Sequence, residues 1–299
     1  MNATPFRSGF VALLGRPNVG KSTLLNYLVG QKIAITSPTA QTTRQRLRGI
    51  VTLPEGQMIL VDTPGIHKPH HRLGEILVKN AQTLVRSVDV VLLLVDGSQP
   101  AGTGDGFIAQ GLATQKTPVL LGLNKQDLVA DEQGERITAS YQALLPAAPL
   151  LPFSAVTGQG IPELQAQLLQ ALPPGPCYYP PEMVTDQPER FIMAELIREQ
   201  IFHLTREEVP HAVAVVVERV EETPKITRIF AAIVVERPSQ KAIIIGNQGQ
   251  MLKTIGSQAR QEMQKLISGP VYLQLFVKVE PKWRQTPRLL QDLGYRLES

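Results

Sequence analysis

Short apolar runs alternate with amphipathic stretches over the first 170 residues. Runs that are apolar on both faces and separated by helical periodicity predict buried parallel strands with helices on both faces of the sheet. A further strand is predicted over 47–53, because a Pro-Glu-Gly turn separates it from the next run. Helices are predicted over 73–87 and 162–171. The five apolar runs that predict strands span residues 10–14, 58–61, 90–95, 119–123 and 150–153.

A proline-rich stretch interrupts this rhythm. Residues 172–188 contain two proline clusters, which disfavour both a helix and a central strand. We interpret the stretch as a stiff linker. The sequence therefore predicts a first domain over 1–172, a linker over 173–188 and a second domain with a C-terminal tail over 189–299.

The second half has a different pattern. Apolar residues at helical spacing predict one helix over 193–204 and another over 252–266. Strands are predicted over 212–218, 226–235 and 271–279, the last with strict alternation. The apolar run 241–245 is interpreted as a strand that leads into a glycine loop. We expect an α+β domain with helices on one face of a small sheet.

Composition excludes several classes of protein. The chain is 43% hydrophobic and 19% charged, which is ordinary for a globular protein. The apolar run 90–95 is far too short to span a membrane, and no signal peptide is expected. A single cysteine, Cys177, excludes an internal disulfide and fits a reducing compartment. The net charge of +4 is too small to indicate nucleic-acid binding by itself.

The clearest chemical signal follows the first apolar run. Residues 15–22 read Gly-Arg-Pro-Asn-Val-Gly-Lys-Ser, the pattern of a phosphate-binding loop between a strand and a helix. Loop N–H groups and the helix dipole favour phosphate. Lys21 would approach the β and γ phosphates, and the Ser22 hydroxyl would ligate Mg²⁺. The alternative is a plain glycine turn between a strand and a helix.

A second signal lies 41 residues after Lys21. Asp62-Thr63-Pro64-Gly65 follows the run 58–61. The Asp62 carboxylate can hold Mg²⁺ through water, and the Gly65 N–H can approach the γ-phosphate. The short pattern alone is common, so its value lies in its position at the end of a strand.

The base-recognition signal is Asn124-Lys125-Gln126-Asp127, after the run 119–123. The Asp127 carboxylate can accept hydrogen bonds from guanine N1–H and N2–H₂, whereas adenine would leave that charge unpaired. The Lys125 stem can lie along the base, and Asn124 can tie this loop to the phosphate loop. Ser154-Ala155 follows the next strand, where the Ala155 N–H could donate to guanine O6. A capped surface loop and an ATPase are the alternatives.

Between the phosphate loop and Asp62 lies a candidate switch segment with consecutive threonines. Thr43 is the preferred ligand for Mg²⁺ and the γ-phosphate, with Thr42 in reserve; it would close in the triphosphate state and release after hydrolysis. Arg44, Arg46 and Arg48 alternate on one strand face. They either contact RNA or are solvated.

These G-domain motifs resemble those of the TrmE–Era–EngA–YihA–Septin group of GTPases, and the second half narrows the resemblance to the Era family. Lys241 to Gly256, with its Ile-Gly-Asn-Gln-Gly loop, is similar to a type II KH domain, and Trp283 to Tyr295 resembles the Era C-terminus. The resemblance implies an α/β P-loop GTPase domain followed by an α+β type II KH domain.

A KH domain would clamp about four nucleotides of single-stranded RNA. Glycines allow backbone to approach backbone, and residues 237–260 contain four basic residues and no acidic one. The alternative is a glycine turn that caps a helix. The predicted RNA contacts are Gly246, Asn247, Gln248, Gly249, Lys253 and Arg260.

Ile66 departs from the pattern of Ras-like GTPases, which carry a water-orienting glutamine after the glycine. Slow intrinsic hydrolysis is therefore expected, and an RNA-binding scaffold with negligible turnover is the rival. Asn18 matches an asparagine that ligates K⁺ in related GTPases. The predicted catalytic residues are Asn18, Lys21, Thr43 and Gly65, and those for Mg²⁺ are Ser22, Thr43 and Asp62. The predicted GTP contacts are Gly15, Asn18, Val19, Gly20, Lys21, Ser22, Thr23, Asp62, Gly65, Asn124, Lys125, Asp127, Ser154 and Ala155.

The Era resemblance also implies partners and location. It implies binding near the 3′ end of small-subunit (16S) ribosomal RNA, a role in 30S subunit assembly, a monomer, and a cytoplasmic protein that associates peripherally with the inner membrane. The tail around 282–288 lacks the acidic residues that Era relatives often carry there. The five histidines lack a metal-ligand spacing and are expected at the surface: His67, His70, His71, His203 and His211.

Overall fold

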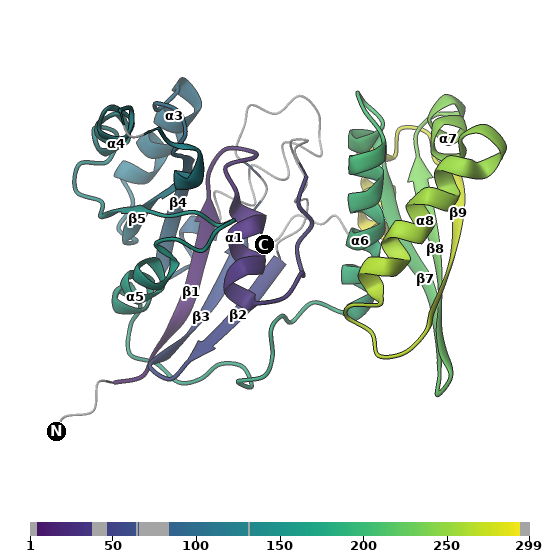
Figure 1. Cartoon of the computed structure of the whole chain (residues 1–299), viewed down its shortest axis with the longest axis horizontal. Coiled ribbons are helices and arrows are strands. Elements are labelled where there is room, and N and C mark those ends of the chain that lie inside the picture. Colours follow the sequence, from purple (N-terminus) through teal and green to yellow (C-terminus); the bar gives the residue numbers. More distant parts are fainter. Residues whose placement is uncertain (1–4, 38–46, 64, 66–83, 131, 294–299) are drawn as a thin grey trace. The chain divides into compact units, whose positions relative to one another are not determined.

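The computed structural model describes residues 5–37, 47–63, 65, 84–130 and 132–293 (Figure 1). The chain forms two compact units, the first made mainly of residues up to Asp186 and the second mainly of residues from Gln187. Most of the predicted helix at 73–87, the preferred switch threonine Thr43 and the departure at Ile66 lie outside the described residues.

The first unit is built on a six-stranded sheet with the order β2-β3-β1-β4-β5-β6. Only β2 runs antiparallel to its neighbour, and the other pairs are parallel. All seven residues of β4 are buried, as expected for a strand covered on both faces. The strands are β1 (Arg7–Leu14), β2 (Leu47–Leu53), β3 (Gly56–Asp62), β4 (Val90–Asp96), β5 (Val119–Asn124) and β6 (Leu150–Pro152).

Helices cover both faces of this sheet. On one face, α1 (Lys21–Val29) contacts β2 and β3, and α5 (Ile161–Ala171) contacts β1 and β3. On the other, side chains of α3 (Thr103–Ala113) and α4 (Gly134–Gln142) join the apolar core of β1, β4 and β5. The short helix η1 (Gln126–Leu128) follows β5. The predicted doubly covered, mostly parallel sheet is confirmed.

The proline-rich segment lies against this sheet. We call residues 173–186 the strap. Gln57 is fully buried in β3, and its Oε1 accepts hydrogen bonds from the N–H groups of Tyr178 and Tyr179 at 2.8 and 3.0 Å. Its Nε2 donates to the Tyr179 carbonyl at 2.8 Å. The side-chain amide therefore satisfies strap backbone that a proline-rich sequence leaves without a regular partner.

The strap then reaches the free edge of β2. The Ile50 N–H donates to the Val184 carbonyl at 2.9 Å, and Arg48 forms an ion pair with Asp186 at 2.7 Å. The segment predicted as a linker is thus hydrogen-bonded to the first unit as far as Asp186. The domain boundaries themselves stay a prediction.

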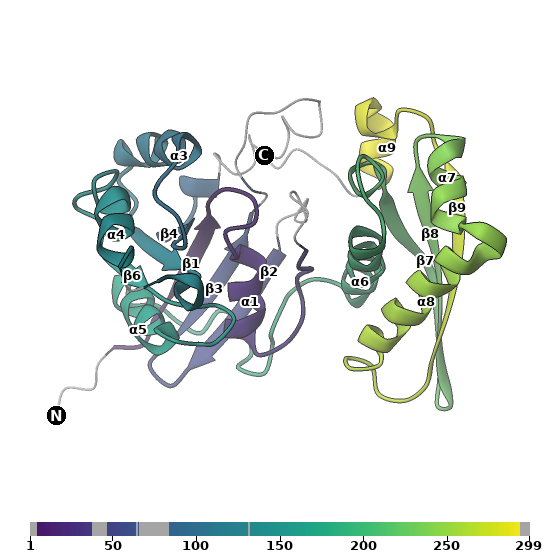
Figure 2. The same cartoon turned by 45° about the horizontal axis from the view of Figure 1, so that its top comes forward.

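The second unit carries a three-stranded sheet with the order β7-β8-β9. β7 (Ala214–Thr223) pairs antiparallel with β8 (Ile226–Val235), which pairs parallel with β9 (Val271–Val279). Helices α6 (Glu189–Leu204), α7 (Pro238–Ile245) and α8 (Gln250–Met263) pack on one face (Figure 1). This α-β-β-α-α-β order is that of the predicted type II KH fold. The short helices are η2 (Pro210–Ala212), η3 (Asn247–Gly249), η4 (Trp283–Gln285) and α9 (Pro287–Asp292), the last of which is labelled in Figure 2.

The prediction of a strand at 241–245 was wrong, because these residues belong to α7. Pro238 stands at the start of the helix, where its missing N–H costs nothing. The Gln240 side chain accepts hydrogen bonds from the N–H groups of Glu236 and Arg237 and so caps the helix. Periodicity cannot separate a five-residue apolar run from a short helix.

The tail closes onto the second unit. Trp283 is fully buried, and its Nε1 donates to the Ala212 carbonyl at 2.9 Å. Within the described ranges, no helix is both long and apolar enough to cross a membrane.

Candidate nucleotide site and nucleic-acid groove

The loop between β1 and α1 has the backbone that its sequence requires. Gly15 and Gly20 have φ values of 146° and 102°, and Asn18 is also left-handed with φ 63°. A Cβ at Gly20 would lie 2.1 Å from Nδ2 of Asn124, so no larger residue fits. The loop turns sharply enough for α1 to begin at Lys21, which places the helix N-terminus beside the loop.

Lys21 is buried within this loop. Its Nζ donates to the carbonyl oxygens of Gly15 and Arg16 at 3.1 and 2.8 Å. Burial lowers the pKa of Lys21 to about 8, although the nearby Asp62 carboxylate acts in the opposite direction. A desolvated ammonium at this position is a strong attractor for phosphate oxygens.

Ser22 and Asp62 meet at the other side of the loop. The Ser22 hydroxyl donates to Asp62 Oδ2 at 2.7 Å, and Asp62 is fully buried. Beyond it, the Thr63 hydroxyl donates to the Leu13 carbonyl at 2.7 Å, which fixes the exit from β3 against β1. A Cβ at Gly65 would lie 2.7 Å from the backbone nitrogen of Pro17, so this glycine lies close to the phosphate loop.

These oxygens fit Mg²⁺. A hydroxyl and a carboxylate are hard ligands, and Mg²⁺ in nucleotide sites is held by one or two protein groups together with phosphates and water. In the described part of the chain, no group of three or more His, Cys, Asp or Glu residues could hold a metal by itself. The third predicted ligand, Thr43, lies outside the described residues.

Asn124 ties three loops together. Its Nδ2 donates to the Val19 carbonyl in the phosphate loop at 2.8 Å, and its Oδ1 accepts from the Ala155 N–H at 2.9 Å. The side chain is almost fully buried. The predicted tie between Asn124 and the phosphate loop is therefore present in the structure.

Asp127 is held by the neighbouring loop. The Ser154 hydroxyl donates to Asp127 Oδ1 at 2.5 Å and accepts from the N–H groups of Val156 and Thr157. Ser154 is fully buried, whereas Asp127 is exposed. A fixed hydroxyl therefore orients a carboxylate that remains open to a ligand.

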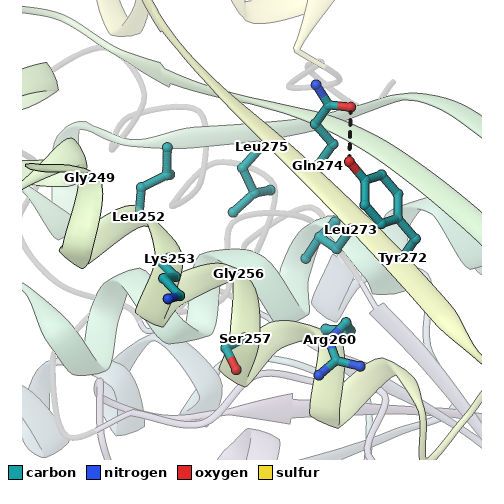
Figure 3. Close-up of a pocket in the computed structure, with 10 residues that line it drawn as sticks. All are labelled: Gly249, Leu252, Lys253, Gly256, Ser257, Arg260, Tyr272, Leu273, Gln274 and Leu275. Carbon is teal, nitrogen blue, oxygen red and sulfur yellow. Dashed lines mark hydrogen bonds between the residues drawn. The ribbon is translucent and has the colours of Figure 1, made fainter.

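In the second unit, a groove of about 440 Å³ lies between α8 and β9 (Figure 3). Leu252, Leu273 and Leu275 give it apolar walls, while Lys253 and Arg260 lie along the helix side. Among the described strands β9 stands at an edge, so its outer backbone groups have no strand partner in the sheet. A groove with apolar walls, cationic side chains and a free strand edge suits the bases and phosphates of a single strand.

The two loop glycines differ. Gly246 has φ 71°, and a Cβ there would lie 2.6 Å from Cβ of Met251. Gly249 has φ 78° and open space around it. Of the six predicted RNA contacts, Gly249, Lys253 and Arg260 line the groove. The other three lie in the preceding loop and are not among the groove's lining residues.

Known proteins resemble this chain over nearly its whole length. Residues 10–125 match a family model described as a 50S ribosome-binding GTPase, and residues 208–284 match the KH domain. The GTPase Era proteins of Synechocystis sp. and Nostoc sp. are both 63% identical to this chain over 98% of its length. The two matches cover 94% and 91% of the relatives' own lengths, respectively. The chain belongs to the Era family.

Solved Era structures support the same assignment. One is Era in complex with MgGDPNP and nucleotides 1506–1542 of 16S ribosomal RNA, and another is an Aquifex aeolicus Era variant bound to GDP·AlF4⁻. Each is 39% identical, with a TM-score of 0.93 over 97% of this chain and 99% of the other. The predicted fold class and GTPase activity are confirmed, which removes the ATPase alternative. The roles of single site residues stay predictions.

Sequence reasoning overlooked two acidic residues that form ion pairs with basic residues of the predicted nucleotide-binding loops. Asp96 ends β4 and forms an ion pair with Lys125 at 2.6 Å, and Asp105 in α3 forms one with Arg16 at 2.8 Å. Burial alone would raise the pKa of Asp96, but hydrogen bonds from Lys125 and Ser98 hold it below its ordinary value. Asp96 follows an apolar run just as Asp62 and Asn124 do, so the same rule would have found it.

Proposed function

We propose that this chain is a GTP-hydrolysing switch that binds small-subunit ribosomal RNA near its 3′ end and acts in assembly of the 30S subunit. One observation carries the proposal. A relative with the same fold along nearly the whole chain was crystallised with MgGDPNP and a 16S ribosomal RNA fragment. The chain described here has a phosphate loop in one unit and a basic groove in the other, as that pair of ligands requires.

In this proposal the phosphate loop cradles the triphosphate. Backbone N–H groups of residues 15–23 face phosphate oxygens, and Lys21 exchanges its two carbonyl partners for the β and γ phosphates. Ser22 and Asp62 would hold Mg²⁺, which neutralises charge that develops on the phosphates. Gly65 would donate its N–H to the γ-phosphate, and Thr43 would complete the metal ligands.

The guanine base would bind between two loops. Asp127 accepts hydrogen bonds from N1–H and N2–H₂, with Ser154 fixing the carboxylate, and the Ala155 N–H donates to O6. Asn124 keeps these groups in register with the phosphate loop. Lys125 contributes the apolar stem of its side chain to the base plane.

Hydrolysis needs help that Ile66 cannot give, since its side chain neither donates nor accepts a hydrogen bond. We propose that Asn18, exposed and left-handed within the phosphate loop, ligates K⁺ beside the phosphates. Single-turnover GTP hydrolysis in K⁺ and in Na⁺ tests this: a faster rate in K⁺ that Asn18→Ala abolishes is expected. Equal rates in the two salts would remove the potassium site.

The RNA strand would lie in the groove beside α8. Loop amides around Gly246 to Gly249 clamp the backbone, Lys253 and Arg260 contact phosphates, and bases meet the apolar walls. The deciding experiment compares the affinity of a 16S ribosomal RNA 3′ fragment for the protein loaded with a non-hydrolysable GTP analogue and with GDP. A switch must bind RNA with different affinities in the two states. Equal affinities would contradict the switch.

The remaining expectations follow from the family alone. We propose a monomeric, cytoplasmic protein that associates peripherally with the inner membrane. Light scattering of the purified protein tests the monomer, and co-sedimentation with anionic lipid vesicles tests the membrane association. A dimer, or protein that stays in the supernatant at low salt, would contradict these proposals.

A further inference from the structure

Asp96 stands at the carboxyl end of β4 and pairs in register with Asn124 of β5. The carboxyl ends of parallel strands are where ligands bind in open α/β sheets. Four other strands end on this edge at or just before predicted nucleotide contacts, namely Gly15, Asp62, Asn124 and Ser154. Asp96 has no role assigned by any of the sequence motifs.

The backbone around Asp96 is fixed from two sides. The hydroxyl of Tyr141, a fully buried residue of α4, donates to the Asp96 carbonyl at 3.0 Å. Burial raises the pKa of Tyr141 to about 12, so the hydroxyl remains a donor at neutral pH. The Gly97 N–H donates to the Asn124 carbonyl at 2.7 Å. These bonds hold β4 and the base-recognition loop in one position relative to each other.

The two carboxylate oxygens of Asp96 have separate partners. Oδ1 accepts from the N–H and hydroxyl of Ser98 at 3.1 and 2.6 Å. Oδ2 accepts from Lys125 Nζ at 2.6 Å, and the Asp96 side chain is only 12% exposed. Ser98 therefore orients the carboxylate, and the oriented carboxylate holds the ammonium of Lys125.

Lys125 needs such an anchor. Its backbone is left-handed with φ 67°, and its side chain has four rotatable bonds. Ordering a lysine side chain costs rotamer entropy, which a bound base would otherwise have to offset. An ion pair that fixes the far end of the side chain leaves the stem already ordered before a base binds.

We propose that Asp96 is a positioning residue for guanine nucleotides: it anchors the Lys125 ammonium so that the aliphatic stem forms one wall of the base site. This rests on the proposed base-binding role of residues 124–127. The stem contacts the face of the base and not its edge. Asp96 therefore contributes to affinity for any purine nucleotide that enters the site, and it does not select among them.

Binding of fluorescent GDP and of fluorescent inosine diphosphate (IDP), which carries a different purine base, to Asp96→Asn tests this. We expect both dissociation constants to rise by the same factor, about 5- to 30-fold. In a Lys125→Met background, adding Asp96→Asn should change neither constant, because the anchored ammonium is already gone. Asp105→Asn is the matched control: this carboxylate pairs with Arg16, so its effect should be the same with and without Lys125.

Two results would overturn the proposal. One is unchanged GDP affinity in Asp96→Asn, and the other is an equal loss in the Lys125→Met background, which would indicate a general structural role. If Asp96→Asn folds poorly, Asp96→Glu takes its place as the test, because it keeps the charge and should bind GDP nearly as tightly as the unmodified protein. A folded Asp96→Glu protein with weak GDP binding would also contradict the anchor. Asp127→Asn separates the two levels, because unchanged GDP affinity there would contradict the base site itself.

Discussion

The nucleotide site and the RNA groove use their side chains in opposite ways. At the nucleotide site, Asn124 and Ser154 are buried and hydrogen-bonded to neighbouring loops. In the groove, Lys253 is exposed and the apolar walls are only partly covered. The first site is assembled by contacts among its own residues, whereas the second is an open surface with charges beside it.

This difference has consequences for recognition. Groups that are already oriented lose little entropy on binding, and a buried polar group left without its partner is heavily penalised. The nucleotide site is therefore suited to reject the wrong base. Exposed cations beside an open groove give affinity that falls with salt and depends less on one contact. Five predictions would break or sharpen this contrast.

The largest effect is expected for Asp127→Asn. The change removes a charged acceptor of two hydrogen bonds, worth about 1.5–3 kcal/mol each, so GTP affinity should fall at least about 100-fold. Xanthosine triphosphate should bind better than GTP, because its base presents an acceptor where guanine presents a donor. Competition binding with the two nucleotides measures this. A variant that still preferred GTP would place base recognition elsewhere.

Alanine substitutions at the two loop glycines, Gly246 and Gly249, should destabilise the second unit to different extents. Gly246→Ala brings a Cβ to 2.6 Å from Met251 and adds left-handed strain, so it should destabilise the second unit by about 2–4 kcal/mol. Gly249→Ala meets no neighbour and should cost about 1–2 kcal/mol from strain alone. Urea unfolding followed by RNA binding of the folded variants measures both. Equal destabilisation would contradict the close packing of Gly246 against Met251.

Lys21 should give GDP binding a pH dependence. With its pKa near 8 the ammonium loses its proton above that pH, while bound phosphates favour the charged form. Affinity should be level below pH 8 and then fall by up to about tenfold per pH unit. Lys21→Arg keeps its charge and should show no such fall. The same slope in both proteins would assign the titration to another group.

The stability of the nucleotide-free protein should rise with pH above pH 8, where the affinity for GDP is expected to fall. The unfolded chain holds the Lys21 proton up to its ordinary pKa of 10.5, whereas the folded protein without nucleotide releases it near pH 8. Unfolding then takes up a proton between these values, so this lysine makes the free energy of unfolding rise with pH there. Urea titrations at pH 7.5 and 9.5, compared with Lys21→Met, isolate the contribution.

The smallest effect is expected for Lys253→Ala. Loss of one phosphate contact should lower the slope of log affinity against log salt by about 0.7 and weaken all RNA sequences alike. Lys265→Ala is the matched control, since Lys265 is exposed beyond the end of α8 and pairs with Glu262. Filter binding over a salt series measures both. An effect confined to one RNA sequence would indicate base contact instead.

The sequence predicted the elements whose burial is two-sided or strictly periodic. The fully buried β4 and the alternating β9 were both found from apolar positions. The helix α7 was missed because five apolar residues fit either structure, although Pro238 at its first position and Gln240 at its third are both helix-start signals. Local pattern decides an element only when it is long enough to show a period.

At the two candidate sites, the sequence predicted the residues that belong to recognised motifs. It missed the residues outside the motifs that contact them or line the same groove. Asn124 and Asp127 were named because their spacing is distinctive. Asp96 and the groove residues of β9 were not, because their roles depend on which strands and helices become neighbours. A single sequence contains that information only through the complete fold.

The strap gives the molecule a built-in reporter. Cys177 is the single cysteine of the chain, and it is exposed. Its sulfur accepts from Gln57 Nε2 at 3.2 Å and donates to the Tyr179 carbonyl at 3.0 Å. A thiol reagent therefore labels one position, at the point where the proline-rich segment meets β3. Because the thiol is already exposed, it can be labelled with the segment in place, and the fluorescence of an environment-sensitive label would report release of the segment with no second cysteine to remove.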